Sequence, residues 1–529
     1  MSFRRDIQPA QFSQEQVRIL AESRVNGGMI TTISKDDIPL SALSLVRNAS
    51  VRFDKTLRRS GSSLYGATKP SALKVLDMYA FKKDDGTYYL LRFTKSGIHV
   101  EGVGTWNALT GALTGSDTDY FNITYAFDQC VFTNGVDDIQ LVNAGVTTFA
   151  DLGNAPKYKY ITSFYNRIVA GYFNNPAGKK PSQLGWSADG VIAEWDPLVN
   201  VSAGSTPLID NPSDTSDDIT GVFGGSDVLI IPRQKTIWLA TKNPVASNPF
   251  RAFTAVFTHG SDAPKSIVRT GYGLVFVDVT TKKVYIYTPV PGNSVQRAEP
   301  ISTYIENEIF RSISNVNDIR GSFDSDTDEY SIIIPFSGSS AVKIWKYNFI
   351  TKAWSYDERE NLSYIGNPVT GAKALSIGDL SGTIGDLLGT IGDLSSVGTP
   401  QPTMLYGYTS GELLKEDRSV DKDNGANYTT TLISKRFTIP SNDIYVHRLN
   451  FQLNVRLPTA ISLYWSKDSG VTWRLAKVFN ITTTGEAILL KYTKNIRCRK
   501  FEWKLEATTG DFDLIDYAVF VYDSTIAYK

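Results

Sequence analysis

One short stretch of the chain has the residue types and the spacing of a hydrogen-bonded turn. Residues 466–473 read SKDSGVTW, which sets Ser466, Asp468, Gly470 and Trp473 in the pattern S-x-D-x-G-x-x-W. In such a turn Asp468 can accept hydrogen bonds from backbone amides, Gly470 can adopt a positive φ, and Trp473 can fold back over the hairpin. These four residues predict a structural hairpin, and we assign them no catalytic role.

The same pattern resembles the Asp box of sialidases, and a degenerate copy, WSADGVIAEW, lies at 186–195. A sialidase would also need three clustered arginines and a tyrosine nucleophile with a carboxylate partner. The one full box lies outside the expected propeller, and IIPRQK at 230–235 does not match the FRIP-like strand. We therefore expect no enzymatic activity. A carbohydrate-binding or glycoside-hydrolysing, sialidase-like propeller is kept as the alternative function.

No other constellation has the spacing that metal or cofactor chemistry requires. The run DSDTD at 324–328 begins like a calcium loop. Its sixth position is Glu329 rather than Gly, and its twelfth is Pro335 rather than Glu. Three histidines are scattered along the chain: His99, His259 and His447. Glycine-rich phosphate cradles do not occur. The sequence predicts no metal site, no catalytic residues and no bound cofactor.

The composition describes a globular chain without a strong net electrostatic field. The 529 residues include 54 Lys and Arg against 54 Asp and Glu, and 42% are hydrophobic. A net charge of zero gives no general attraction to nucleic acid or to an anionic membrane. Two short basic clusters, at 57–59 and 497–500, are expected to be solvated. With only Cys130 and Cys498, folding in a reducing cytosol is expected. Neither a signal peptide nor a membrane-spanning segment is predicted.

The elements that position these residues are predicted to be mainly strands. Residues 12–17 have the form of a hydrophobic staple and capping box with Ser13 as N-cap, which predicts a helix over 13–24. Isoleucines at 301, 305 and 309 predict a second short helix near Pro300. Almost everything else alternates between apolar and polar residues and is punctuated by Gly, Asn and Asp, which is typical of antiparallel β-structure.

Seven strand–turn–strand units repeat through the middle of the chain. They start roughly 35 to 75 residues apart, and a four-stranded propeller blade needs about 40 to 50. A single blade cannot bury both faces of its sheet, so the units are expected to close into a ring. We predict a β-propeller of six or seven blades over 66–425, with two stacked sandwiches as the alternative.

Two loop insertions are predicted within the propeller, at 201–226 and 376–398. The second contains IGDL three times at a seven-residue spacing, and its many glycines argue against a coiled coil. Residues 1–65 are expected to form an N-terminal arm with the short helix. Regular strands with short turns predict a separate C-terminal β-sandwich at 426–529.

Several motifs, in this order, resemble the tail nozzle (lower tail-tube) proteins of short-tailed bacteriophages. They are GG at 27–28, LVRN at 45–48, LRRSG at 57–61, YNRIVAG at 165–171, LGWS at 184–187 with Trp195, FD at 323–324 with DEY at 328–330, and YN at 347–348 with AWS at 353–355. The resemblance covers about 25 to 420, and the order of the motifs carries it rather than any single one.

The resemblance implies a structural role in a virion tail, after synthesis in the cytoplasm of the host bacterium. Six copies would form a ring below the portal and the tail adaptor proteins, with tail fibres or tailspikes attached around it. Double-stranded DNA would pass through the bore without specific binding. Zero net charge suits such a conduit, because a wall that neutralised many phosphates would retain DNA through counterion release.

Overall fold

The computed structural model describes residues 17–523 except 67–68, 103–104, 176–177, 210–216, 291–295, 312, 314, 336–339, 371–400 and 440–443. Contacts divide the chain into two compact units. Unit 1 comprises Met1–Gly61, Lys346–Asp357 and Ser419–Lys529, and unit 2 comprises Ser62–Trp345 and Glu358–Arg418. Three consecutive segments, 1–65, 66–425 and 426–529, were expected. The contacts instead group the N-terminal segment with the C-terminal strands.

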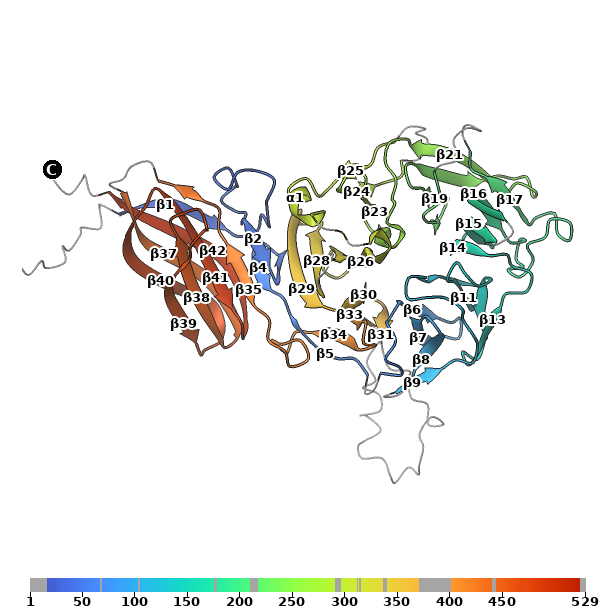
Figure 1. The fold of residues 1–529 in the computed structure, drawn as a ribbon, viewed down its shortest axis with the longest axis horizontal. Coiled ribbons are helices and arrows are strands. Elements are labelled where there is room, and N and C mark those ends of the chain that lie inside the picture. Colours follow the sequence, from blue (N-terminus) through green and yellow to red (C-terminus); the bar gives the residue numbers. More distant parts are fainter. Residues whose placement is uncertain are drawn as a thin grey trace, which may run out of the picture. The chain divides into compact units, whose positions relative to one another are not determined.

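Unit 2 consists of successive four-stranded sheets (Figure 1). The first three are β6 (Asp77–Lys82), β7 (Tyr88–Thr94), β8 (Gly97–Gly102) and β9 (Thr105–Ala108); β10 (Asn122–Ala126), β11 (Gln129–Thr133), β12 (Gln140–Val142) and β13 (Phe149–Asp151); and β14 (Tyr158–Ser163), β15 (Ile168–Asn175), β16 (Gly178–Trp186) and β17 (Gly204–Pro207). In each of them consecutive strands pair antiparallel, as the alternating pattern predicts.

The following sheets continue in chain order. They are β18 (Phe223–Gly224), β19 (Val228–Pro232), β20 (Ile237–Lys242) and β21 (Phe250–Val256); β22 (Val268–Thr270), β23 (Gly273–Asp278), β24 (Lys283–Tyr287) and β25 (Glu299–Pro300); β26 (Arg320–Asp324), β27 (Glu329–Pro335), β28 (Ala341–Asn348) and β29 (Ala353–Glu360); and β30 (Leu362–Gly366), β33 (Leu405–Tyr408), β34 (Leu413–Asp417) and β5 (Gly61–Leu64). Between β30 and β33 in the chain, β31 (Val369–Thr370) and β32 (Gln401–Pro402) form a separate two-stranded sheet. Residues 346–357 of β28 and β29 belong to unit 1. There β29 pairs parallel with β2 (Leu45–Arg47), so β26 to β29 form part of a ten-stranded sheet that continues through β2 rather than a separate four-stranded sheet.

Buried apolar side chains fill the space between neighbouring sheets of unit 2. Phe93 of β7 packs on Phe132 of β11, with ring centroids 5.5 Å apart. Leu90 of β7 shares another core cluster with Tyr364 of β30 and Leu405 of β33, so the first sheet also packs on the last. The sheets therefore close into a propeller-like ring, as the repeated units predict.

The first strands of successive sheets also contact one another, β10 with β14 and β14 with β18. Asn122 Oδ1 accepts a hydrogen bond from the Ile161 amide at 2.7 Å, and Thr124 Oγ1 accepts one from the Ser163 amide at 3.0 Å. The ring is completed from the other end of unit 2, because β5 pairs with β34 in the last sheet. This closing strand was not predicted, because residues 61–64 were assigned to the N-terminal arm at 1–65.

Unit 1 contains a β-sandwich of two sheets. One sheet holds β1 (Val17–Arg24), β3 (Ala49–Arg52), β4 (Lys55–Arg58), β42 (Asp511–Asp523), β37 (Ile444–Leu457) and β40 (Gly485–Arg497). The other contains β2 (Leu45–Arg47), β35 (Thr430–Ile433), β36 (Phe437–Thr438), β41 (Lys500–Ala507), β38 (Thr459–Ser466) and β39 (Arg474–Ile481). Trp503 of the second sheet packs between Phe451 and Tyr517 of the first, with ring centroids 5.1 and 5.2 Å away. The expected sandwich is therefore present, with N-terminal strands added to it.

The N-terminal helix predicted over 13–24 is wrong for the residues that are described. Val17–Arg24 is strand β1, and it pairs antiparallel with β42 from Val17–Tyr522 to Arg24–Asp516. An isolated helix of this length is marginal in water, whereas the edge of β42 offers a ladder of backbone partners. Residues 13–16, which carry the capping pattern, lie outside the described part.

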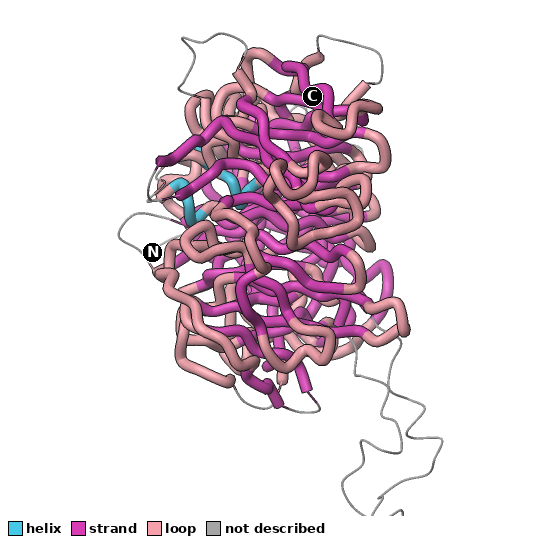
Figure 2. Tube along the Cα trace, turned by 90° about the vertical axis from the view of Figure 1, so that its right-hand side faces the viewer, coloured by secondary structure: helices cyan, strands magenta, loops and turns pink. Residues whose placement is uncertain are grey.

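Helical segments are few in the described residues (Figure 2). The short helix predicted to begin near Pro300 is present only in part, because Glu299–Pro300 is strand β25 and the helix α1 is limited to Glu306–Ile309. Ile309 of α1 is buried. The segment 201–226, expected to be an inserted loop, contains β17 and β18. The IGDL insertion predicted at 376–398 lies wholly outside the described residues.

Candidate functional site

The Asp-box residues form the turn between β38 and β39 in unit 1. The Ser466 hydroxyl donates to Asp468 Oδ1 at 2.7 Å and accepts from the Gly470 amide at 2.9 Å. Asp468 Oδ1 also accepts from the Thr472 amide at 2.9 Å, and its second oxygen accepts from the Thr472 hydroxyl. Gly470 has φ +79°, where a side chain would be strained. The Asp468 carboxylate therefore stabilises the hairpin turn that contains it.

These hydrogen bonds also favour the ionised form of the Asp468 carboxyl. The hydroxyl and amide of Thr472, followed by the Ser466 hydroxyl, lower the pKa of Asp468 from 3.8 to about 2. A carboxylate held ionised in this way does not act as a proton donor near neutral pH. Trp473 lies on the same turn, with the Lys504 ammonium 5.2 Å from its ring centroid.

The degenerate copy of the box and the YNR motif meet in the β14–β17 sheet of unit 2. Arg167 is buried and donates from Nη1 to the carbonyl oxygens of Ser187, at 2.9 Å, and Ser202, at 2.5 Å. The Ile168 amide donates to Ser187 Oγ at 3.0 Å. Trp195 donates from Nε1 to the Ile192 carbonyl at 2.9 Å. The motif residues therefore hold loops together in the interior.

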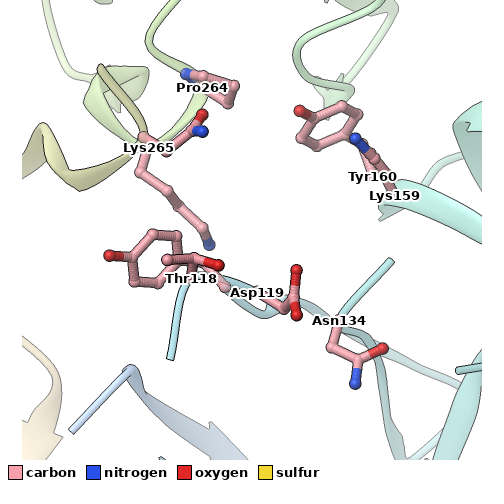
Figure 3. A pocket seen from close by; sticks show the side chains of 9 residues that line it. Thr118, Asp119, Asn134, Lys159, Tyr160, Pro264 and Lys265 are labelled. Atoms are coloured by element: carbon pink, nitrogen blue, oxygen red, sulfur yellow. The ribbon is translucent and has the colours of Figure 1, made fainter. Parts of the chain in front are cut away.

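A cavity of 190 Å³ lies within unit 2 (Figure 3). Its lining comes from loops and first strands of several sheets: Thr118, Asp119, Tyr120, Asn134, Lys159, Tyr160, Pro264, Lys265 and Asn317. The lining has hydroxyl groups on Thr118, Tyr120 and Tyr160, but none of the nine residues is a histidine that could act as an imidazole base beside them. Sequence reasoning missed this cavity, because its residues span 118–317 with no common spacing.

Two lysines and one carboxylate set the electrostatics of the cavity. Lys265 Nζ donates to Asp77 Oδ2 at 3.0 Å and to the Phe121 carbonyl. Burial lowers the pKa of Lys265 and of Lys159 below the ordinary lysine value. Asp119 accepts from the Ser116 amide at 2.8 Å. The Lys265 charge is therefore already balanced, and the cavity can hold a small polar molecule.

The candidate metal ligands do not gather. Among the described residues there is no group of three His, Cys, Asp or Glu side chains that could hold a metal ion. His259 Nδ1 lies 3.6 Å from Asp278, and His447 Nδ1 lies 2.7 Å from Asn495 Oδ1. Burial lowers the pKa of His99 in unit 2. The DSDTD run is the turn between β26 and β27.

Within the part of the chain that the structure covers, no helix has the length and apolar character needed to cross a membrane.

The basic cluster at 57–59 was expected to be solvated, and this expectation is wrong. Arg58 is 3% exposed and Arg59 is 4% exposed. Arg59 Nη1 donates to Asp423 Oδ1 at 2.9 Å, and its guanidinium lies 3.5 Å from the ring centroid of Tyr428. Arg58 donates to backbone carbonyls, among them Thr508 at 3.2 Å. Arginine forks satisfied by such acceptors can be buried without losing their charge.

No family model matches the chain, and no curated protein matches it in sequence. Three of the solved structures that are similar to it share between 10% and 14% sequence identity with it. They are BBS1N in complex with ARL6DN (10% identity, 68% of this chain and 98% of that chain, TM-score 0.39), a quinonprotein alcohol dehydrogenase-like protein from Bacteroides thetaiotaomicron (12%, 54% and 65%, 0.30) and TmCBM61 in complex with beta-1,4-galactotriose (14%, 25% and 77%, 0.15). These TM-scores are too low to carry an argument about this chain.

Proposed function

We propose that this chain is a non-enzymatic structural component of a bacteriophage tail. Six copies assemble as the nozzle, the lower tail tube below the portal and the adaptor proteins. Double-stranded DNA is ejected through its bore without specific binding, and fibres or tailspikes attach to its outside. The proposal begins from the ordered motifs that resemble the nozzle family across about 25 to 420.

The observation that carries the proposal is the place of the motif residues in the fold. Arg167 and Ser187 are buried in unit 2, and Arg167 donates a hydrogen bond to the Ser187 carbonyl. Arg58 and Arg59 of LRRSG are buried in unit 1. Motif residues that are buried and hydrogen-bonded to the backbone favour a structural role, because catalytic groups must be able to reach a substrate.

We also propose that the ring of unit 2 has seven blades. The blades are the sheets that begin at β6, β10, β14, β18, β22, β26 and β30, counted over the described residues. β5 completes the last blade, so the ring is closed by a strand from before the first blade. A closed ring has no open first or last sheet, which suits a part that must withstand the passage of DNA.

Labelling of intact particles tests the proposal. Gold-labelled antibody against this chain should bind the distal tail of short-tailed particles that contain it, and pre-immune antibody should not. Mass measurement of the isolated tail complex should give six copies. Label on the capsid alone, or a particle without the chain, would contradict the assignment to the tail.

One contact favours glycoside hydrolysis as the second candidate function. The Tyr65 hydroxyl donates to Glu101 Oε1 at 2.5 Å, and burial raises the pKa of both groups. A tyrosine beside a carboxylate is the nucleophile arrangement of sialidase-like hydrolysis.

Assays with fluorogenic sialosides and other glycosides separate the two functions. Hydrolysis that is lost in Glu101→Gln but kept in Glu486→Gln, a control at an exposed carboxylate, would favour the enzyme. Absence of hydrolysis in the intact chain would leave the nozzle as the better-supported function.

A further inference from the structure

One segment of unit 1 concentrates positive charge in a chain whose net charge is zero. Residues 467–500, here called the basic segment, contain eight Lys and Arg against two Asp and Glu, a net charge of +6. The segment includes the Asp-box turn, β39, β40 and the RCRK cluster. β39 and β40 contact each other although they belong to different sheets (Figure 1). The charge is therefore gathered along one edge of the sandwich, where β39 and β40 are the outermost strands of their sheets.

All eight cations of the basic segment are exposed. Six of them form no ion pair with a described carboxylate: Lys467, Arg474, Lys477, Lys491, Lys494 and Lys500. Other basic side chains of unit 1 do have carboxylate partners: Lys55 pairs with Asp513 at 2.6 Å and Arg436 with Glu502 at 3.2 Å. Neighbouring unpaired cations raise each other's energy, so a negative partner would be bound favourably.

β40 also offers an unused backbone edge. It is the last strand of its sheet, paired with β37 on one side, and no described strand pairs with its other side. Its 13 residues give an edge about 40 Å long at the usual rise of a strand. Such an edge accepts an added strand unless it is protected.

Apolar side chains are mixed with the charges of the basic segment. Val471 is 79% exposed, Leu475 57% and Leu489 48%. Exposed apolar side chains between cations favour a protein partner over the phosphate backbone of a nucleic acid, which would leave them in water. Pairing of β40 with β40 of a second copy would set lysines against lysines, so a second copy is disfavoured.

We propose that the free edge of β40 binds an extended acidic segment of a partner protein, which adds to the sheet as a further strand. The partner's backbone pairs with β40, and its carboxylates meet Lys491, Lys494 and the neighbouring cations. Its apolar side chains cover Leu489. This inference goes beyond the tail function and does not rest on it, because it uses only the charge, the edge and the apolar side chains of unit 1.

Binding of a short synthetic peptide of alternating Glu and Val to the full-length protein tests the proposal. The peptide should bind, the corresponding Lys and Val peptide should not, and added salt should weaken binding. Lys491→Glu with Lys494→Glu should reduce the affinity about tenfold or more. Lys179→Glu with Lys180→Glu, the same charge change at exposed residues of β16, should leave it unchanged.

Hydrogen exchange decides whether a strand is added. Peptide binding should protect the β40 amides that point away from β37. Circular dichroism of each variant shows whether it is folded, and Lys491→Gln with Lys494→Gln gives a milder charge change if the reversal unfolds the protein. The proposal is overturned if duplex DNA or anionic vesicles bind while the peptide does not. It is also overturned if polyglutamate binds as well as the peptide without protecting β40, or if the protein associates only with itself.

Discussion

The two basic clusters of unit 1 have similar sequences and opposite surroundings. At 57–59 the side chains of Arg58 and Arg59 are buried, and carbonyl oxygens and Asp423 surround their guanidinium groups. At 497–500, Arg499 and Lys500 are exposed. A run of basic residues in the sequence therefore does not show whether its side chains are buried or exposed. That depends on whether the fold places hydrogen-bond acceptors around the charges.

The arginine pair is expected to contribute far more to stability than the exposed cluster. Desolvation of a guanidinium is costly, so its partners in the folded state must compensate for the lost water, and removing either side of the pair exposes the full cost. An exposed cation keeps its water in both the folded and unfolded states, and its removal changes little. The following changes test this difference, from the largest expected effect to the smallest.

Arg59→Ala should lower the free energy of unfolding of unit 1 by about 3 to 4 kcal/mol, because it removes the buried guanidinium that pairs with the Asp423 carboxylate. The change also removes the cation from the Tyr428 ring. Urea unfolding measures the loss. In a double-mutant cycle with Asp423→Asn, the two changes should cost less together than the sum of the single changes. Additive losses would show that the pair is not coupled.

Arg58→Lys should cost about 2 kcal/mol, although it keeps the charge, because an ammonium cannot reproduce the planar fork of donors. Arg58 bonds Thr430 Oγ1 at 3.1 Å and the carbonyl oxygens of Thr508 and Tyr428 at 3.2 and 3.3 Å. The same urea titration measures the effect. A variant as stable as the native protein would mean that charge alone fills this position.

Gly470→Ala should cost about 1 kcal/mol because of the positive φ in the Asp-box turn. A Cβ there would also lie 3.1 Å from Glu502 Oε2 and 3.3 Å from Lys35 Nζ. Gly485→Ala is the matched control, since its φ is not in the left-handed region and its nearest atom would be 3.9 Å away. Calorimetric melting of both variants compares them, and equal melting temperatures would contradict the strain argument.

The Asp468 carboxyl should titrate with a midpoint near pH 2 in the folded protein, below its ordinary value of 3.8. A folded-state pKa that is depressed contributes stability above the unfolded pKa, and the contribution is lost as pH falls through about 2. NMR titration of the Thr472 amide, which donates to this carboxylate, gives the midpoint. Asp468→Asn should remove the step, and a midpoint near 4 would show that the turn does not hold the carboxylate.

Lys491→Gln with Lys494→Gln should change the free energy of unfolding by no more than about 0.5 kcal/mol, because both side chains are exposed. The urea titration used for the arginine variants makes the comparison direct. A loss of the same size as that of Arg59→Ala would erase the contrast between the two clusters.

The features that sequence reasoning located are those built from residues close together in the chain. The Asp-box hydrogen bonds join residues two to four positions apart, so eight consecutive letters were enough to suggest a hairpin. The repeated strand units were visible for the same reason, since each antiparallel pair is joined by a short turn.

The features that it missed depend on distant partners. Val17–Arg24 has a local pattern that favours a helix, yet β42, about 500 residues away in the chain, gives it a strand partner. The cavity lining is collected from 118 to 317, and no local pattern links those positions. Long-range pairing of this kind can override local propensity, which amounts to about 1 kcal/mol or less per residue.

By itself the sequence determined the β class, the turn chemistry and the succession of sheets, because period-two alternation and Asx-type hydrogen bonds act between near neighbours. The tertiary structure alone decided which charges are buried, which strands close the ring and which edge stays free. Those outcomes depend on groups such as Thr430, 372 positions from the arginine that it binds. Burial and pairing depend on which distant residues the fold brings together, and the order of residues along the chain does not show this directly.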